Sequence, residues 1–180
     1  MKVENIHIVG ASGSGTSTLG KALEDNYRFK QLDTDNYFWL PTNPPFTTSR
    51  ERNERISLLK EDILCNEKCV VSGSLCGWGD TLIPYFDLII RIITPTDIRI
   101  ERIKKRELNR FGERILLGGD MYEAHEKFIK WASDYDTGST DMRSKALHDQ
   151  WLKKINCLKV EIDGSDIKKE LPLIEEYFID

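Results

Sequence analysis

A glycine-rich segment near the N-terminus contains the residue types that bind phosphate. It reads Gly10-Ala-Ser-Gly-Ser-Gly-Thr-Ser17, follows a short apolar run and precedes a helical pattern. Glycines let the backbone turn tightly with its N–H groups pointing inward, and a helix N-terminus adds about half a positive charge. The spacing matches the phosphate-binding pattern G-x-x-x-x-G-K-S/T, although a plain Gly/Ser turn is the alternative. We expect phosphate contacts from Gly10, Ser12, Gly13, Ser14, Gly15, Thr16, Ser17 and Thr18.

Two carboxylates and a hydroxyl are candidate ligands for Mg²⁺. Asp33 and Asp35 flank Thr34 at the end of a second predicted strand. Alternate residues of an extended segment point to the same side, so both carboxylates are expected to face one site. There they could orient metal-bound water or accept substrate hydroxyls. Ser17 occupies the metal-ligand position of the loop. A solvated turn is the alternative, because Asp is common in turns.

One position of the loop departs from the pattern. Thr16 stands where a lysine normally supplies a positive charge to the β- and γ-phosphates. Lys21 lies further along the expected helix and cannot take that place without a different geometry. Loss of one preorganised donor slows a charged transition state roughly 10²–10³-fold. Phosphate binding should therefore survive this departure better than catalysis does.

A row of arginines follows the fourth predicted strand. Spacings of three and four place them on one helical face: Arg99, Arg102, Arg106 and Arg110, with Arg114 beyond a glycine. The guanidinium fork suits phosphate oxygens, and the glycines around this stretch are typical of hinges. We expect a mobile lid whose arginines supply the charge that Thr16 lacks. A solvated face paired with neighbouring glutamates is the alternative.

The third predicted strand ends in glycines and an aromatic residue. Gly73 and Ser74 permit close approach to a ligand, and Trp78 is either a pocket wall or core packing. Asp80 is a weaker candidate base. A second basic cluster after a proline-rich loop includes Arg50 and Arg55. The predicted substrate contacts are Asp35, Arg50, Arg55, Gly73, Ser74 and Trp78.

The rest of the sequence predicts the elements that position these residues. Strands are predicted at 6–9, 29–32, 70–71 and 88–93, and the alternating pattern of 158–162 predicts a fifth. Periodic patterns predict helices at 16–26, from a Ser49 cap through 64, from 94–95 onward, at 121–134, at 141–155 and from 167 to the end. Alternating strands and helices indicate an α/β fold with a mostly parallel sheet covered on both faces, with ligands at the carboxyl ends of the strands.

Composition limits the class of protein. The 180 residues are 39% hydrophobic and 31% charged, a length for one domain spanning 1–180. The net charge of -4 argues against a nucleic-acid partner. The four cysteines fit neither a metal pair nor a disulfide framework, and the three histidines are interpreted as structural. No signal peptide or spanning stretch is evident, so we expect a soluble cytoplasmic protein without a membrane partner, monomeric or homodimeric.

These motifs together resemble the P-loop kinases of the nucleoside monophosphate and shikimate/gluconate kinase group. The resemblance rests on 10–17, 33–35, 70–74, the 88–95 strand with its arginine helix, and the Asp163-Gly164-Ser165 turn. It implies a three-layer fold with a five-stranded sheet, a substrate-binding insertion at 36–65, a lid at about 107–125, and ATP with Mg²⁺. It further implies that Asp33 orients metal-bound water, Asp35 contacts substrate hydroxyls, Arg106 contacts the nucleotide, Arg110 and Arg114 belong to the lid, and Gly164 lies near the adenine.

Two functions follow. The first is an ATP-dependent small-molecule kinase in which Arg106, Arg110 or Arg114 replaces the lysine. The third strand lacks the Gly-Tyr/Phe-Pro-Arg of adenylate kinases and reads Gly73-Ser-Leu-Cys-Gly-Trp78. That difference favours a hydroxyl compound or an atypical nucleotide over AMP as acceptor. The second function, motivated by Thr16, is a nucleotide- or phosphate-binding regulatory protein without turnover.

Overall fold

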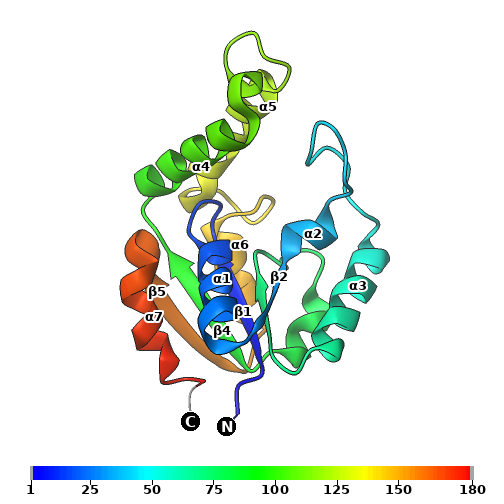
Figure 1. Ribbon diagram of the computed structural model, residues 1–180, viewed down its shortest axis with the longest axis vertical. Helices are drawn as coiled ribbons and strands as arrows, with labels where there is room; N and C mark the ends of the chain where they lie inside the picture. Colours follow the sequence, from blue (N-terminus) through cyan, green and yellow to red (C-terminus); the bar gives the residue numbers. More distant parts are fainter. Residues whose placement is uncertain (1, 179–180) are drawn as a thin grey trace.

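The computed structural model describes residues 2–178 and contains a five-stranded parallel sheet in the order β2-β3-β1-β4-β5 (Figure 1). The α/β fold class and the sheet predicted from the sequence are confirmed. The strands are β1 Asn5–Gly10, β2 Lys30–Asp33, β3 Cys69–Ser72, β4 Leu88–Ile93 and β5 Leu158–Asp163.

Helices follow the strands in alternation (Figure 1). The α-helices are α1 Thr16–Tyr27, α2 Thr34–Phe38, α3 Arg52–Cys65, α4 Thr96–Phe111, α5 Tyr122–Ser133, α6 Lys145–Leu152 and α7 Ile167–Glu175. Short 3-10 turns are η1 Asp80–Tyr85, η2 Gly112–Ile115, η3 Asp134–Asp136 and η4 Gly164–Asp166. Within residues 2–178, no helix combines the length and apolar character needed to cross a membrane.

The sheet divides the core into two apolar layers because successive strand residues point to opposite faces. On β1, Ile6 and Ile8 pack toward α1 and α7, whereas Val9 belongs to the layer formed with α3 and α6. All three side chains are fully buried. Such burial on both faces explains why β1, β3 and β4 are almost continuously apolar in sequence.

Two local predictions were wrong, one about where a helix starts and one about an extended segment. The helix after the proline-rich loop is capped by Glu51 and not by Ser49, because the Glu51 carboxylate accepts hydrogen bonds from the N–H groups of Asn53 and Glu54. The 33–35 segment is not extended throughout. Asp33 caps the short helix α2, with its side chain accepting from the Asp35 N–H, so the alternation argument fails there.

The base of α4 is fixed by Arg99, whose side chain is completely buried. Its guanidinium donates to the carbonyls of Thr94 and Ala132, at 3.0 Å each, and to Asp136 at 2.7 Å. These bonds join the end of β4 to α5 and η3. Arg99 was predicted to lie on the phosphate-facing row, but the structure places it in the interior, where a charged group requires such partners.

Replacing Arg99 should therefore unfold the protein more readily. We expect Arg99→Ala to lower the free energy of unfolding by about 1–3 kcal/mol, because it leaves the Thr94 and Ala132 carbonyls without this donor. Asp136 is partly exposed and keeps its hydrogen bond from Thr96, so it contributes little to the loss. Urea denaturation measures this. Lys105→Ala, on the exposed face of the same helix, should change stability by less than about 0.5 kcal/mol. Equal losses in both variants would contradict the structural role given to Arg99.

Candidate active site

The loop between β1 and α1 has the backbone geometry of an anion-binding turn. Gly13 and Gly15 have φ angles of +79° and +108°, in the left-handed region that favours glycine. A Cβ at Gly13 would lie 2.5 Å from the carbonyl oxygen of Arg99. No side chain caps α1, and no acidic residue occupies its first turn. The first N–H groups of the helix are therefore available to an anion.

The remaining loop residues surround this turn. Ser17 and Thr18 are exposed at the start of α1, and Ser12 and Thr16 are partly exposed. Ser14 is buried, and its hydroxyl has no hydrogen-bond partner. Gly164 supports the loop, because a Cβ there would lie 2.5 Å from the Ser14 carbonyl oxygen. The predicted contact at Gly164 is therefore adjacent to the loop in space, although it is distant in sequence.

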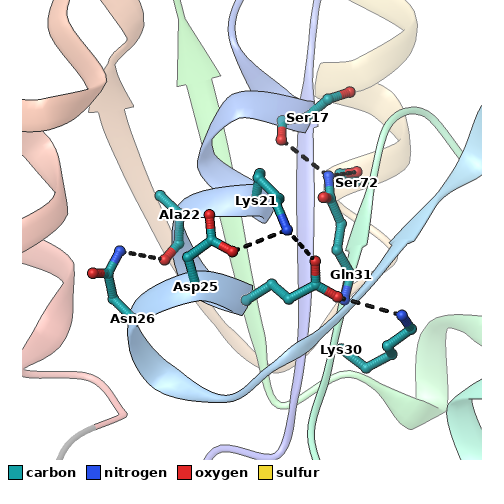
Figure 2. Close-up of polar contacts among 9 residues, drawn as sticks. Ser17, Lys21, Ala22, Asp25, Asn26, Lys30, Gln31 and Ser72 are labelled. Atoms are coloured by element: carbon teal, nitrogen blue, oxygen red, sulfur yellow. Dashed lines mark hydrogen bonds and ion pairs between the residues drawn. The ribbon is translucent and has the colours of Figure 1, made fainter.

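Lys21 does not take the place of the missing lysine. Its Nζ lies 2.9 Å from carboxylate oxygens of Glu24 and Asp25, further along α1. Figure 2 shows this ammonium group turned toward Asp25 and away from Ser17. The exclusion of Lys21 made from sequence agrees with this placement.

Ser17 and Asp33 form a pair of hard oxygen donors beside the loop. The Ser17 hydroxyl donates to Asp33 Oδ2 at 2.6 Å. Gln31 holds the segment by donating to the Ser17 carbonyl at 2.9 Å, the contact that Figure 2 shows. Within the described chain, no group of three or more His, Cys, Asp and Glu residues could hold a metal. The pair fits Mg²⁺, which keeps several waters and uses few protein ligands together with substrate phosphates.

Asp35 lies next to this pair at the start of α2. Desolvation and, after it, the nearby charge of Asp33 raise the pKa of the Asp35 carboxyl. Arg143, Arg106 and Arg110 oppose that rise. The two aspartates thus approach each other closely, as predicted, although a helix cap and not an extended strand brings them together.

Arg143 was missed in the sequence analysis. It is partly buried, interacts electrostatically with Asp35, and has its guanidinium 5.6 Å from the Trp131 ring. Burial lowers its pKa, and Asp35 counteracts that effect. The predicted helix 141–155 would have placed it on a regular face, but the helix begins only at Lys145 after a Ser144 cap. No motif in the sequence marks a lone arginine in such a turn.

The arginines of α4 and the segment after it separate into distinct roles. Arg102 donates to the carbonyls of Gly164 and Ser165 at 2.7 and 2.8 Å, which fixes the turn after β5. Arg106 is paired with Glu107. Arg102, like Arg99, was expected on the phosphate-facing row and instead binds the protein itself.

Arg110 and Arg114 lie at the far end of this segment. Arg114 forms a two-pronged ion pair with Asp120 at 2.7–2.9 Å. Arg110 makes no ion pair or hydrogen bond to any residue from 2 to 178, and its guanidinium lies 5.5 Å from the Phe46 ring. Arg110 therefore has all its N–H donors available to a ligand.

Arg55 is the most distinctive predicted substrate residue. Its guanidinium lies 4.2 Å from the Phe38 ring centroid and 5.3 Å from that of Trp78. Its Nε and Nη1 atoms are buried without a hydrogen-bond partner. Burial is the main cause of its lowered pKa. Unpaired buried donors are costly, so the arrangement suits an anion.

We call Arg55 and the Phe38 and Trp78 rings beside it the acceptor wall. The predicted substrate residues Arg50, Trp78 and Gly73 are held by internal bonds or tight packing. Arg50 is paired with Glu54 at 2.7 Å, and its Nε donates to the Tyr37 carbonyl. Trp78 is buried and donates its ring N–H to the Ser74 carbonyl at 3.1 Å. Gly73 has a φ of +117°, and a Cβ there would lie 1.9 Å from the Thr34 hydroxyl.

The side chains of Asp80 and His148 are held by hydrogen bonds within the protein. Asp80, the weaker candidate base, accepts from the Trp151 ring N–H at 2.9 Å and from Lys154 at 2.7 Å. His148 lies 3.1 Å from the Ser74 hydroxyl and 2.8 Å from the Tyr135 hydroxyl. Burial lowers the pKa of His148 to about 3, so this histidine is neutral.

The fold and this loop define a P-loop protein, and comparisons with known proteins agree. The family model described as "AAA domain" matches residues 6–116. The chain belongs to this AAA domain family. It is also 49% identical over 164 residues, 90% of each chain, to the uncharacterized protein YqaC of Bacillus subtilis.

Two small-molecule kinases are among the solved structures of similar fold. The shikimate kinase of Bacteroides thetaiotaomicron has a TM-score of 0.57 and 16% identity, covering 97% of this chain and 98% of that one. The deoxyadenosine kinase of M. mycoides, solved with bound dATP, also has a TM-score of 0.57 and 16% identity, covering 98% and 100%. At such identities the likeness establishes the fold, and the predicted P-loop kinase fold is thereby confirmed.

The charge of Asp35 should cost the unliganded protein stability. An acid whose pKa is raised by folding destabilises the folded state above that pKa, and the penalty vanishes below the unfolded pKa. We expect Asp35→Asn to raise the free energy of unfolding at pH 7 by less than about 1 kcal/mol. Neighbouring groups partly desolvate the carboxyl, but the residue remains open to water, which screens its charge. The gain should shrink as the pH falls through the Asp35 pKa. Urea titrations between pH 3 and 7 test this, and destabilisation by Asp35→Asn at pH 7 would contradict it.

Proposed function

We propose that this protein is a small-molecule kinase that transfers the γ-phosphoryl group of ATP to a hydroxyl group, using Mg²⁺. The observation that supports this most directly is the Ser17–Asp33 hydrogen bond of 2.6 Å beside an uncapped helix N-terminus. The helix N-terminus binds phosphate through backbone N–H groups. Ser17 and Asp33 would hold the metal and its waters, and the bound Mg²⁺ would neutralise charge that develops on the phosphates.

Arg110 is the residue we assign to the charge that Thr16 lacks. It makes no hydrogen bond or ion pair within residues 2–178, and its guanidinium lies over the rings of Phe46 and Phe111. It also acts electrostatically on Asp35, so it lies near the reacting centre. Arg106 acts on Asp35 too, but Glu107 already pairs with it. Arg114 is engaged by Asp120. A single unpaired guanidinium at the site can stabilise charge in the transition state as preorganised donors do.

The acceptor is proposed to be a hydroxyl compound with an anionic group. Asp35 would accept the hydroxyl proton as the oxygen attacks the γ-phosphorus, and ADP leaves with the electrons of the broken P–O bond. The raised pKa of Asp35 suits this proton transfer. The buried, unpaired N–H groups of Arg55 would bind the anionic group. Arg143 provides a second positive charge close to Asp35.

Binding of a nucleotide without turnover is the competing function, and Thr16 is the observation that favours it. We prefer the kinase because Arg110 and Arg55 would otherwise be unpaired cations without a role. In the competing function, Thr16→Lys should tighten ATP binding and create no reaction. In the kinase, Thr16→Lys should alter an activity that already exists.

Calorimetric titration with ATP tests the donor site. We expect the wild-type protein to bind ATP with micromolar affinity, and Mg²⁺ to change that affinity. Ser17→Ala should remove the effect of Mg²⁺ and retain binding of the metal-free nucleotide, because the loop N–H groups remain. Ser139→Ala, which changes an exposed hydroxyl in the turn before α6, is the control. Absence of ATP binding at millimolar concentration would overturn the proposal.

Turnover with a panel of anionic hydroxyl compounds tests the catalytic assignment. Arg110→Ala should slow ADP release roughly 10²–10³-fold, the loss typical for one preorganised donor. Lys104→Ala, an exposed residue on the same helix, should leave the rate unchanged. A rate for Arg110→Ala within twofold of wild type would remove Arg110 from the mechanism, and no ADP release with any acceptor would favour the competing function.

A further inference from the structure

The loop between α2 and α3 contacts the arginine-bearing end of α4 through an aromatic ring. Phe46 is 39% exposed, and its ring centroid lies 5.5 Å from the Arg110 guanidinium carbon. A second contact runs in parallel, because Arg114 donates to the Asn43 side-chain oxygen at 3.4 Å. These contacts join segments that Figure 1 shows as separate projections above the sheet.

Phe46 adopts a backbone conformation that its side chain disfavours. Its φ angle is +62°, and Phe46 and Arg28 are the non-glycine residues with positive φ in the described part of the chain. Bulky residues rarely occupy this region, and such outliers cluster at functional sites. Arg28 has an ordinary reason, since it ends α1 as a C-cap. Phe46 lies in a turn of the 39–49 loop, and in this conformation its ring contacts Arg110 and Trp39.

The ring of Phe46 is also connected to the acceptor wall, through Trp39. Phe46 meets Trp39 edge to face, with centroids 6.1 Å apart, and Trp39 meets Phe38 at 4.8 Å. Phe38 is the ring on which Arg55 stacks. The rings therefore connect the unpaired arginine of the proposed donor side with the unpaired arginine of the proposed acceptor side.

We propose that Phe46 is a positioning residue that holds Arg110 over the donor phosphates. This inference rests on the proposed kinase function and adds a residue that acts through Arg110. Without Phe46 the guanidinium would keep only the more distant Phe111 ring, at 5.8 Å, and no ion pair within residues 2–178. It would then sample more rotamers, and ordering it on binding costs free energy. Stacking on an aromatic face restrains the guanidinium and leaves its in-plane N–H donors free for phosphate oxygens.

The position of Phe46 also links the two ends of the site. Binding of an anion at Arg55 acts on Phe38 and, through Trp39, on the ring that holds Arg110. Such a link makes acceptor and donor binding energetically coupled, and the coupling must be reciprocal. The loop would thus favour the arrangement of Arg110 that phosphoryl transfer needs when both ligands are present.

The test is a double-mutant cycle on the affinity for ATP with Mg²⁺, measured by calorimetry. Phe46→Ala should weaken binding about twofold to fivefold, the range that a cation–π contact at an exposed site represents. Phe46→Tyr should retain wild-type affinity, because it keeps the ring. The double variant with Arg110→Ala should bind no more weakly than Arg110→Ala alone, since Phe46 acts only through that guanidinium.

Thr48→Ala is the matched control, because this exposed residue lies in the same loop and its side chain makes no hydrogen bond to any of residues 2–178. It should bind ATP as the wild type does. Equal affinity of Phe46→Ala and wild type, or additive losses in the double variant, would overturn the positioning role while leaving the kinase proposal intact. If the wild-type protein binds no ATP at all, both proposals fail together.

Discussion

Arg99 places a positive charge, fully removed from water, at the junction of β4, α4 and α5. Its bonds to Thr94, Ala132 and Asp136 satisfy groups from two segments that are far apart in sequence, the end of β4 and the α5–η3 segment. The backbone carbonyl of Arg99 packs so closely on Gly13 of the phosphate loop that a side chain at Gly13 would not fit. The same residue therefore sets the direction of the arginine helix and supports the turn that receives phosphate. Every distance between the loop and Arg106 or Arg110 depends on this junction.

The parts of the molecule that the sequence predicted well are those governed by short-range rules. Apolar runs located β1, β3 and β4, because buried parallel strands need apolar residues on both faces. Alternation of apolar and polar residues located β5, which is mostly exposed. Glycine spacing located the phosphate loop, since the left-handed angles at Gly13 and Gly15 exclude most other residues. Asp33 and Asp35 were paired correctly although the supposed reason, an extended backbone, was wrong.

Predictions that depended on a side chain's contacts with residues distant in sequence were less successful. Helical spacing placed Arg99, Arg102, Arg106 and Arg110 on one face, but it says nothing about what that face meets. Arg99 proved to be interior, and Arg102 binds carbonyls of the turn after β5. Arg143 has no motif around it, because it reaches Asp35 through an irregular turn. The aromatic contacts of Phe46 depend on two loops approaching in space, which no local pattern encodes.

The end of β3 limits how a protein of this design can diverge. Gly73 leaves no room for any side chain, because even a single carbon there would collide with the Thr34 hydroxyl. Ser74 is bound to buried His148 on its other side. The adjacent positions 73 and 74, at the end of β3, therefore tolerate few substitutions. In a kinase of the proposed kind, adaptation to new acceptors would fall instead on exposed loop positions such as Thr48, whose side chain faces solvent.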